Sequence, residues 1–253
     1  MINLVELKNK WLLEEEKGFK GWDFTHLDGR WEEEKIPWDY KEGVMNYLKP
    51  EAKLLDMGTG GGEFLLTLGH PYENTSVTEA WEPNVKLCKE TLEPLGICVK
   101  QVFEDDKLPF DDDTFDLIIN RHESYDVREV KRILKRNGLF ITQQVGGTNN
   151  ELLSKALIPN FKSLYPDLLL SIEREKFSNE GFTVLYENEY LPYIRFFDIG
   201  AIVYYAKIID WEFPGFSVDN CFDRLCELQK VLMKQGYIES FEHRFILIAR
   251  NDK

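Results

Sequence analysis

A single glycine-rich stretch at residues 54–68, LLDMGTGGGEFLLTL, constrains the fold more than any other part of the chain. An apolar run ends at Leu55, Asp56 follows, and four glycines then stand within the five residues 58–62. From Phe64 the pattern becomes apolar and helical, which indicates a buried strand, a tight loop and the start of a helix. Glycine is required where the backbone turns with positive φ or where a ligand approaches the main chain. The stretch therefore predicts an α/β sheet that binds a ligand at the end of a strand.

The rest of the chain alternates between strand-like and helix-like segments. Seven strands are expected, at residues 53–57, 75–80, 97–103, 114–120, 139–145, 182–190 and 240–250. Helices are expected at residues 62–69, 83–93, 126–135, 149–158, 165–180, 196–210 and 219–235. Alternation with short links predicts a doubly wound α/β fold, in which a mainly parallel sheet is covered by helices on both faces.

Two segments lie outside this alternation. Residues 1–49 are expected to form an N-terminal helix, at about residues 3–17, followed by an aromatic arm. Loops rich in aromatic and polar side chains are commonly lids, although an arm packed on the domain surface is an equal alternative. The main domain is expected over residues 50–253, with a helical insertion at about 191–236 as its C-terminal addition.

Composition narrows the classes of partner. Forty-five acidic and 31 basic residues give a net charge of −14, which argues against a nucleic acid partner without excluding it. No apolar run approaches the ~20 residues of a membrane span, and the acidic N-terminus resembles no secretory or transit signal, so we expect a cytoplasmic protein. Four cysteines without C-x-x-C spacing are interpreted as reduced thiols, and no metal site is expected.

The spacing of the glycines restricts the ligand. A dinucleotide fingerprint needs a glycine at the sixth position, and counting from Gly58 that position is Glu63. A P-loop fails as well, because no Gly-Lys-Ser/Thr follows. The pattern that is present, Asp56-x-Gly58-x-Gly60-x-Gly62, resembles the first motif of the class I S-adenosylmethionine-dependent methyltransferases. That cofactor has no pyrophosphate, so it needs close backbone approach and nearby carboxylates more than an anion hole.

Three further stretches extend the resemblance to about residues 50–148, and one of them, residues 128–144, resembles the helix, turn and fifth strand of the family. Glu79 ends the second strand, where the family places an acid that binds both ribose hydroxyls, as a carboxylate accepting two hydrogen bonds can do. The spacing to the following proline departs by one residue from the family, which makes Glu82 a lesser candidate. Residues 103–118, FEDDKLPFDDDTFDLI, resemble the family stretch whose first acid accepts from the adenine amino group; that position is Glu104, with Asp105 beside it.

The resemblance implies a seven-stranded sheet with its last strand antiparallel, and S-adenosylmethionine as the cofactor. Within the family the chain looks most like the small-molecule methyltransferases of the quinone-biosynthesis type. The cofactor-binding residues that it implies are Asp56, Gly58, Thr59, Gly60, Gly62, Glu79, Ala80, Glu104, Asp105 and Asn120.

The acceptor is expected beyond the fourth strand, which ends in residues 120–125, NRHESY. His122 is the first candidate for a general base because its ordinary pKa lies near neutrality, with Glu123 orienting it and Tyr125 contacting the substrate. A structural histidine and a packed tyrosine are the alternatives. The expected substrate-binding residues are His26, Arg30, Trp38, Arg121 and Gln144.

The predicted function is transfer of a methyl group to a small molecule. Two other functions stay open at this point: methylation of an rRNA or tRNA base, and binding of S-adenosylmethionine without turnover. The fourth strand does not end in the Asp/Asn-Pro-Pro-Tyr sequence of the amino-group DNA methyltransferases, which disfavours that chemistry.

Overall fold

The structure is a computed structural model that describes residues 3–19 and 23–253. The chain forms two compact units. Unit 1 comprises the segments Met1–Ile36, Gly146–Asp167 and Tyr190–His243, and unit 2 comprises Pro37–Val145, Leu168–Glu189 and Arg244–Lys253. The predicted arm at 1–49 is thus divided between the units, and its residues 1, 2 and 20–22 lie outside the described residues.

Unit 2 contains a seven-stranded sheet in the order β4-β3-β2-β5-β6-β10-β7. The central strand β2 pairs in parallel with β3 on one side and with β5 on the other. The last strand, β10, runs antiparallel to β6, which confirms the predicted sheet with its antiparallel last strand. The strand bounds are β2 (Leu54–Met57), β3 (Thr75–Glu79), β4 (Cys98–Gln101), β5 (Phe115–Arg121), β6 (Leu134–Val145), β7 (Phe182–Tyr190) and β10 (Arg244–Asn251).

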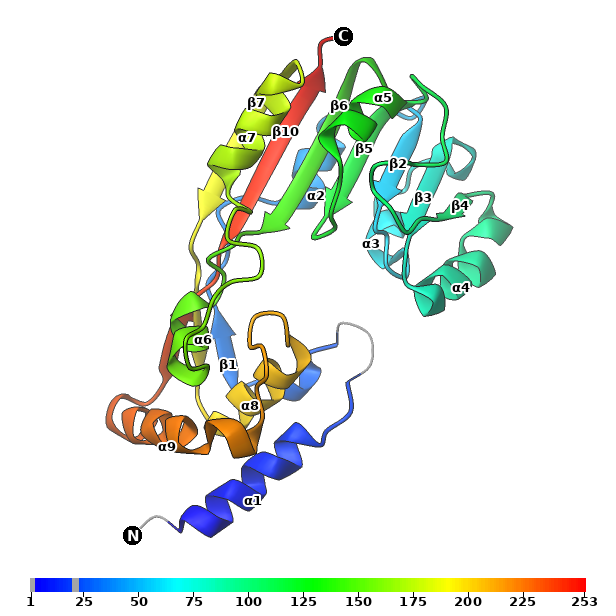
Figure 1. Ribbon diagram of the computed structural model, residues 1–253. Helices are drawn as coiled ribbons and strands as arrows, with labels where there is room; N and C mark the ends of the chain where they lie inside the picture. Colours follow the sequence, from blue (N-terminus) through cyan, green and yellow to red (C-terminus); the bar gives the residue numbers. More distant parts are fainter. Residues whose placement is uncertain (1–2, 20–22) are drawn as a thin grey trace. The chain divides into compact units, whose positions relative to one another are not determined.

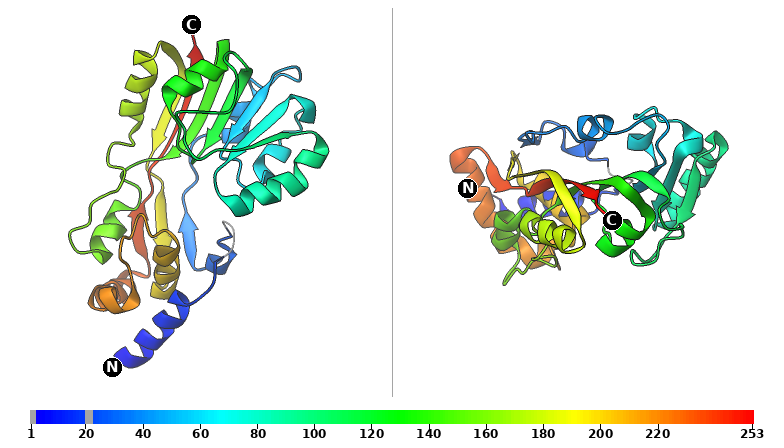
Figure 2. Two further views of the ribbon diagram at one scale, coloured as in Figure 1. Left: turned by 45° about the vertical axis from the view of Figure 1, so that its right-hand side comes forward. Right: turned by 90° about the horizontal axis from the view of Figure 1, so that it is seen from above.

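Helices cover both faces of this sheet (Figure 1; Figure 2, right). Successive side chains of a strand point to opposite faces, so Leu54 packs in one apolar cluster and Leu55 in another. The cluster around Leu54 includes residues of α2 (Tyr40–Met45), α3 (Glu63–Leu66) and α4 (Glu82–Thr91). The cluster around Leu55 includes residues of α5 (Val127–Ile133) and α7 (Leu170–Asn179). Burial on both faces explains why the central strands read as continuous apolar runs.

Several helices are shorter than the sequence predicts, and one of them ends where a strand begins. The helix expected at 126–135 ends at Ile133, and β6 begins at the next residue, Leu134. Leu134 pairs with Phe115, and the register shifts before the regular pairing of the two strands resumes. Asn137, with φ of +62°, lies in this irregular part of the strand together with Gly138.

Unit 1 is built around a second, three-stranded sheet in the order β1-β8-β9, which the sequence does not predict. Both pairings are antiparallel. The predicted strand at 240–250 divides into β9 in unit 1 and β10 in unit 2. The elements of unit 1 are α1 (Leu4–Glu15), β1 (Trp31–Glu33), α6 (Glu151–Leu157), β8 (Tyr193–Phe196), α8 (Ile199–Ile208), α9 (Val218–Gln235) and β9 (Ile238–Phe241).

Helix α8 lies at the centre of the unit 1 core. Eight of its residues are buried, and they pack with Trp11, Phe196 and Phe213. Three short 3₁₀ helices complete the described elements: η1 (Thr25–Leu27), η2 (Tyr72–Asn74) and η3 (Glu93–Leu95). Among residues 3–19 and 23–253, no helix has the length and apolarity needed to cross a bilayer.

Candidate active site

The glycine loop joins β2 to α3 with three residues in the left-handed region, Gly58 (φ +67°), Gly60 (φ +62°) and Gly62 (φ +85°). A side chain at Gly58 would place its Cβ 2.5 Å from Cγ of Glu123. A Cβ at Gly62 would lie 2.8 Å from Cδ1 of Leu92. Glycine is therefore required twice over at both positions, by backbone conformation and by close approach of a neighbouring side chain.

Asp56 and Thr59 fix the start of the loop. The Thr59 hydroxyl donates to Oδ2 of Asp56 at 2.7 Å, and the Thr59 N–H donates to the carbonyl of Thr78 at 3.1 Å. The Asp56 side chain is buried. Burial raises the pKa of Asp56 to about 7, and the hydrogen bond from Thr59 opposes that shift.

Glu79 links the glycine loop to the start of α4. One carboxylate oxygen accepts from the Gly60 N–H at 2.8 Å, and the other accepts from the N–H groups of Ala80 and Trp81 at 2.9 and 3.0 Å. The residue is buried. A carboxylate has about four acceptor sites, so these three bonds leave capacity for a hydroxyl donor.

A pocket opens where β2, β3 and β5 end. Of the predicted cofactor residues, Gly58, Glu79, Ala80 and Asp105 line it, whereas Glu104 is exposed and lies outside the lining. Phe103 and Leu108 also line it, and both stand in the acidic stretch 103–118 that the sequence marks for adenine. The full lining is Met57, Gly58, Thr78, Glu79, Ala80, Val102, Phe103, Asp105, Leu108, Glu123 and Ser124.

Asn120, at the end of β5, carries a buried donor without a partner. Its Oδ1 accepts from Nε2 of Gln144 at 2.7 Å and from the Thr142 hydroxyl at 3.0 Å. Its backbone carbonyl accepts from the Tyr40 hydroxyl at 3.0 Å. Its Nδ2 makes no hydrogen bond, although the residue is fully buried. An unsatisfied buried donor is costly, so this group is suited to a ligand acceptor.

His122 is tied to Gln143. The Gln143 Nε2 lies 3.2 Å from Nε2 of His122, and Oε1 of Gln143 accepts from Nε1 of Trp38 at 2.8 Å. Because the Gln143 amide nitrogen donates to Nε2 of His122, this ring nitrogen is the acceptor and the ring proton is on Nδ1. His122 keeps an exposed surface. Its pKa is nevertheless lowered to about 3, first by the burial of its ring among protein atoms and then by the positive charges of Arg244 and Arg121. His122 is therefore neutral and a weak base at neutral pH.

Glu123 lies at the pocket itself, against Gly58. Burial, and then the negative charges of Glu79 and Asp105, raise its pKa above the ordinary value. The Ser124 hydroxyl donates to Oε1 of Glu123 over 3.4 Å, which is long for a hydrogen bond of this kind. A carboxyl group of raised pKa that faces a pocket is a candidate proton acceptor.

Two predicted residues of this segment lie in other surroundings. Tyr125 donates to Oε2 of Glu173 at 2.8 Å, and its ring packs against Phe140 and Phe177 at centroid distances of 5.0 and 5.8 Å. It is not part of the pocket lining, so the structure favours the packing alternative for this tyrosine. The guanidinium of Arg121 stacks over the ring of Phe64 at 4.5 Å.

His26 and Arg30 belong to an ionic cluster within unit 1. Arg30 donates to both carboxylate oxygens of Asp198, at 2.8 and 2.6 Å, and lies 3.2 Å from Oε1 of Glu14. Nε2 of His26 lies 2.7 Å from Oε2 of Glu14. The cluster connects α1 to the residue that caps α8, Asp198. A role of His26 and Arg30 in substrate binding stays a prediction.

Comparison with known proteins agrees with this arrangement. Residues 55–142 match the family described as a methyltransferase domain. No curated protein gives a significant match. Among solved structures, the YcgJ protein of Bacillus subtilis is 18% identical with a TM-score of 0.55 over 85% of this chain and 98% of its own. A proposed sarcosine dimethylglycine methyltransferase from Galdieria sulphuraria is 18% identical with a TM-score of 0.51 over 84% of this chain and 83% of its own.

The same fold also carries a different activity. The [4+2]-cyclase SpnF is 18% identical with a TM-score of 0.52 over 83% of this chain and 78% of its own. At such identities the structural likeness establishes the fold alone. The family match covers residues 55–142, which include the glycine loop at the end of β2, and the order of the strands around β2 is consistent with a methyltransferase fold.

Proposed function

We propose that the chain uses S-adenosylmethionine to methylate a small molecule. One observation carries the proposal: the glycine loop and the Glu79 carboxylate, which are hydrogen-bonded to each other, line a single pocket at the ends of the parallel strands. Ligands of open α/β sheets bind at this edge, where neighbouring connections leave on opposite faces.

The residues of the pocket fit this cofactor. Gly58 lines the pocket with its main chain, and the Glu123 side chain lies directly against it. The carboxylates of Glu79, Asp105 and Glu123 suit a cationic sulfonium and the hydroxyl and amino donors of an adenosyl group. The unpartnered Nδ2 of Asn120 suits an acceptor atom. When bound, S-adenosylmethionine supplies an activated methyl group, and orientation, exclusion of water and proton removal fall to the protein.

Each carboxylate then has a separate task. Glu79 accepts from the ribose hydroxyls, and Asp105 accepts from the adenine amino group. Glu123 accepts the proton that an acceptor hydroxyl, amine or thiol loses on methylation, since its pKa is shifted toward neutrality. His122 has a lowered pKa, and its Nε2 accepts a hydrogen bond from the Gln143 amide, so no proton transfer is assigned to it.

The charge of the protein supports a small-molecule acceptor over a nucleic acid. Binding of RNA relies on cations that neutralise phosphates. Here the pocket lining contains three acids and no lysine or arginine, and the whole chain carries a net charge of −14.

Calorimetric titration with S-adenosylhomocysteine tests the cofactor assignment. We expect micromolar affinity, on the order of −8 kcal/mol, for the wild-type protein. Glu79→Ala should weaken binding at least tenfold, which corresponds to about 1.4 kcal/mol. Glu82→Ala is the matched control, because Glu82 begins α4 only three residues later and does not line the pocket. Absence of binding to the wild-type protein would refute the proposal.

A turnover assay separates methyl transfer from binding alone. Release of S-adenosylhomocysteine is measured with phenol, amine and thiol acceptors of small size. Release with one acceptor class supports the proposal, whereas tight binding without release from any of them favours a non-catalytic binding module.

A further inference from the structure

We propose that Glu129 and Arg132, on α5, form a clamp that positions the loop at residues 102–114 for cofactor binding. The inference rests on the proposed function, because the loop matters as the wall of the cofactor pocket. Neither residue lines that pocket, so both are positioning residues that act through the loop.

The loop needs support from outside itself. Between β4 and β5 it contains no helix or strand, yet it supplies Val102, Phe103, Asp105 and Leu108 to the pocket. Leu108 is buried, whereas Phe103 is 78% exposed. A segment with few internal hydrogen bonds keeps a fixed shape only when its polar backbone groups are bound elsewhere.

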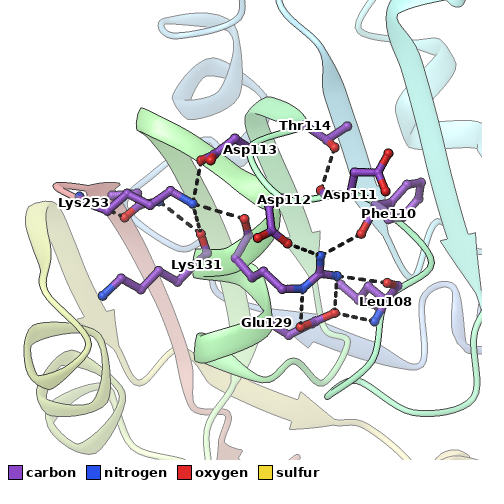
Figure 3. Close-up of polar contacts among 11 residues, drawn as sticks. Leu108, Phe110, Asp111, Asp112, Asp113, Thr114, Glu129, Lys131 and Lys253 are labelled. Carbon is purple, nitrogen blue, oxygen red and sulfur yellow. Dashed lines mark hydrogen bonds and ion pairs between the residues drawn. The ribbon is translucent and has the colours of Figure 1, made fainter.

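The clamp binds the loop at its backbone (Figure 3). Oε1 of Glu129 accepts from the Leu108 N–H at 2.6 Å. Nη2 of Arg132 donates to the Leu108 carbonyl at 3.1 Å, and Nη1 donates to the Phe110 carbonyl at 2.8 Å. Both polar backbone groups of a pocket residue are thus held from α5, which fixes where the Leu108 side chain lies.

The two clamp residues also bind each other. Nε and Nη2 of Arg132 donate to the two carboxylate oxygens of Glu129 at 2.9 and 2.6 Å, and Nη1 also reaches Oδ1 of Asp112 at 2.7 Å. The hydrogen bond from Arg132 lowers the pKa of Glu129, and the one from Glu129 raises the pKa of Arg132, so both stay charged near neutrality. Only a planar guanidinium makes all of these bonds together, and lysine does not reproduce them.

The end of α5 is itself anchored. The Asp113 N–H donates to the Arg132 carbonyl at 3.0 Å. Nζ of Lys253 donates to the carbonyls of Lys131 and Arg132, at 2.8 and 3.1 Å, and lies 2.7 Å from Oδ1 of Asp113. Helix carbonyls at a C-terminus lack partners within the helix, and these contacts supply them. The C-terminal end of α5 is therefore held both by the end of the loop, at Asp113, and by the last residue of the chain, Lys253.

Arg132→Lys tests the clamp, with Arg128→Lys as the matched control one turn earlier on the same helix. Arg128 is exposed, and its one hydrogen bond to a side chain is made by its backbone N–H. Hydrogen–deuterium exchange of the loop peptide is measured first, without ligand. We expect faster exchange at the Leu108 amide in Arg132→Lys alone, while peptides of β2 and β5 exchange as in the wild-type protein.

Affinity is then measured with S-adenosylhomocysteine and with adenosine, which contains only the half of the cofactor that the loop faces. We expect Arg132→Lys to weaken both ligands by a similar factor, about tenfold. The value of kcat at saturating cofactor should stay unchanged, since the clamp does not touch the acceptor.

Unchanged exchange at Leu108 would overturn the inference, as would unchanged affinity for both ligands in a variant whose loop exchanges faster. Failure of the wild-type protein to bind S-adenosylhomocysteine would refute the proposed function instead. Equal thermal stability of the two lysine variants excludes global unfolding as the cause of a loss of affinity.

Discussion

Two carboxyl groups beside the glycine loop, those of Asp56 and Glu123, have pKa values above their ordinary range. Asp56 is buried beside a single hydroxyl donor, and no cation contacts it closely enough to offset the loss of water. Glu123 faces two other acids. Burial is the first cause of both shifts, and neighbouring acids, Glu79 in each case, add to it.

Asp56 makes the stability of the protein dependent on pH. Its pKa in the folded protein is about 7, above the ordinary 3.8, so the native state binds more protons than the unfolded state between these values. The free energy of unfolding should therefore fall as pH rises from about 4 to about 7. Asp56→Asn should remove this pH-dependent loss of stability. The free energy of unfolding of the variant should exceed that of the wild-type protein by an amount on the order of a few kcal/mol at pH 8, and by less near pH 5.

Urea denaturation of both proteins at the two pH values measures this difference. An equal difference in the free energy of unfolding at pH 5 and at pH 8 would show that Asp56 is ionised in the folded protein at both pH values. The amide oxygen of the variant still accepts from Thr59, so the loop keeps its hydrogen bond.

His122 and Glu123 should differ in their effect on turnover. Glu123→Gln removes the proposed proton acceptor and should lower kcat about 100-fold. His122→Ala should leave kcat nearly unchanged, because the neutral ring has a lowered pKa and contacts Gln143. In the wild-type protein, kcat should fall as pH drops through the raised pKa of Glu123, and this acid limb should vanish in Glu123→Gln. Initial rates between about pH 5 and 9 test both statements; a larger loss in His122→Ala would restore the histidine as base.

The glycine loop is the element whose geometry the function depends on most. Gly58→Ala and Gly60→Ala place a side chain at nearly the same positive φ, which costs roughly 1–2 kcal/mol in each. Only at Gly58 does the new Cβ meet Glu123, and nothing lies within 4 Å of it at Gly60. We therefore expect Gly58→Ala to lose more stability and more affinity for S-adenosylhomocysteine than Gly60→Ala. Thermal denaturation measures the stability and calorimetry the affinity. Equal losses in the two variants would mean that the Glu123 side chain moves away from the new Cβ without cost.

Elements with a strong local signal are the ones that the sequence predicts. The seven strands of the large sheet carry apolar runs between turn residues, and the acids Asp56 and Glu79 stand where such runs end. The small sheet carries no such signal, since β1 contains only the residues Trp31–Glu33 and β8 directly precedes an apolar helix. Its strands exist because residues 31–33, 193–196 and 238–241 pair with one another, and pairing over such separations leaves no local periodicity.

Contacts between distant residues limited the prediction of the site in the same way. The glycine loop and Glu79 follow from a short motif, which is why their neighbourhood could be foreseen. The chain of hydrogen bonds from Trp38 through Gln143 to His122 joins three separate segments. The pKa of the histidine is lowered by burial and then by the charges of Arg244 and Arg121, which are also contacts of the folded protein. The lowered pKa of His122 and the raised pKa of Glu123 therefore could not be predicted without the folded protein.

At the scale of the whole molecule, each unit takes three separate segments of the chain. The sequence predicts a boundary after residue 49, whereas unit 2 begins at Pro37 and unit 1 resumes at Gly146. The predicted insertion at about 191–236 contains β8, α8 and α9, all of unit 1. Composition gives no signal for such an interleaved division, because both units contain apolar cores and polar surfaces of the ordinary kind.

Net charge is a property of the whole molecule, and it yields the last prediction. With a charge of −14 and three acids in the pocket lining, the protein should repel a polyanion at any salt concentration low enough to leave charges unscreened. We expect no saturable binding of a short single-stranded RNA or an RNA hairpin up to about 100 µM at about 50 mM salt. Fluorescence anisotropy measures this, with a basic RNA-binding protein as positive control and S-adenosylhomocysteine present in half of the samples. Binding that weakens steeply with added salt would reveal a local cationic surface, and it would move the methyl acceptor from a small molecule to RNA.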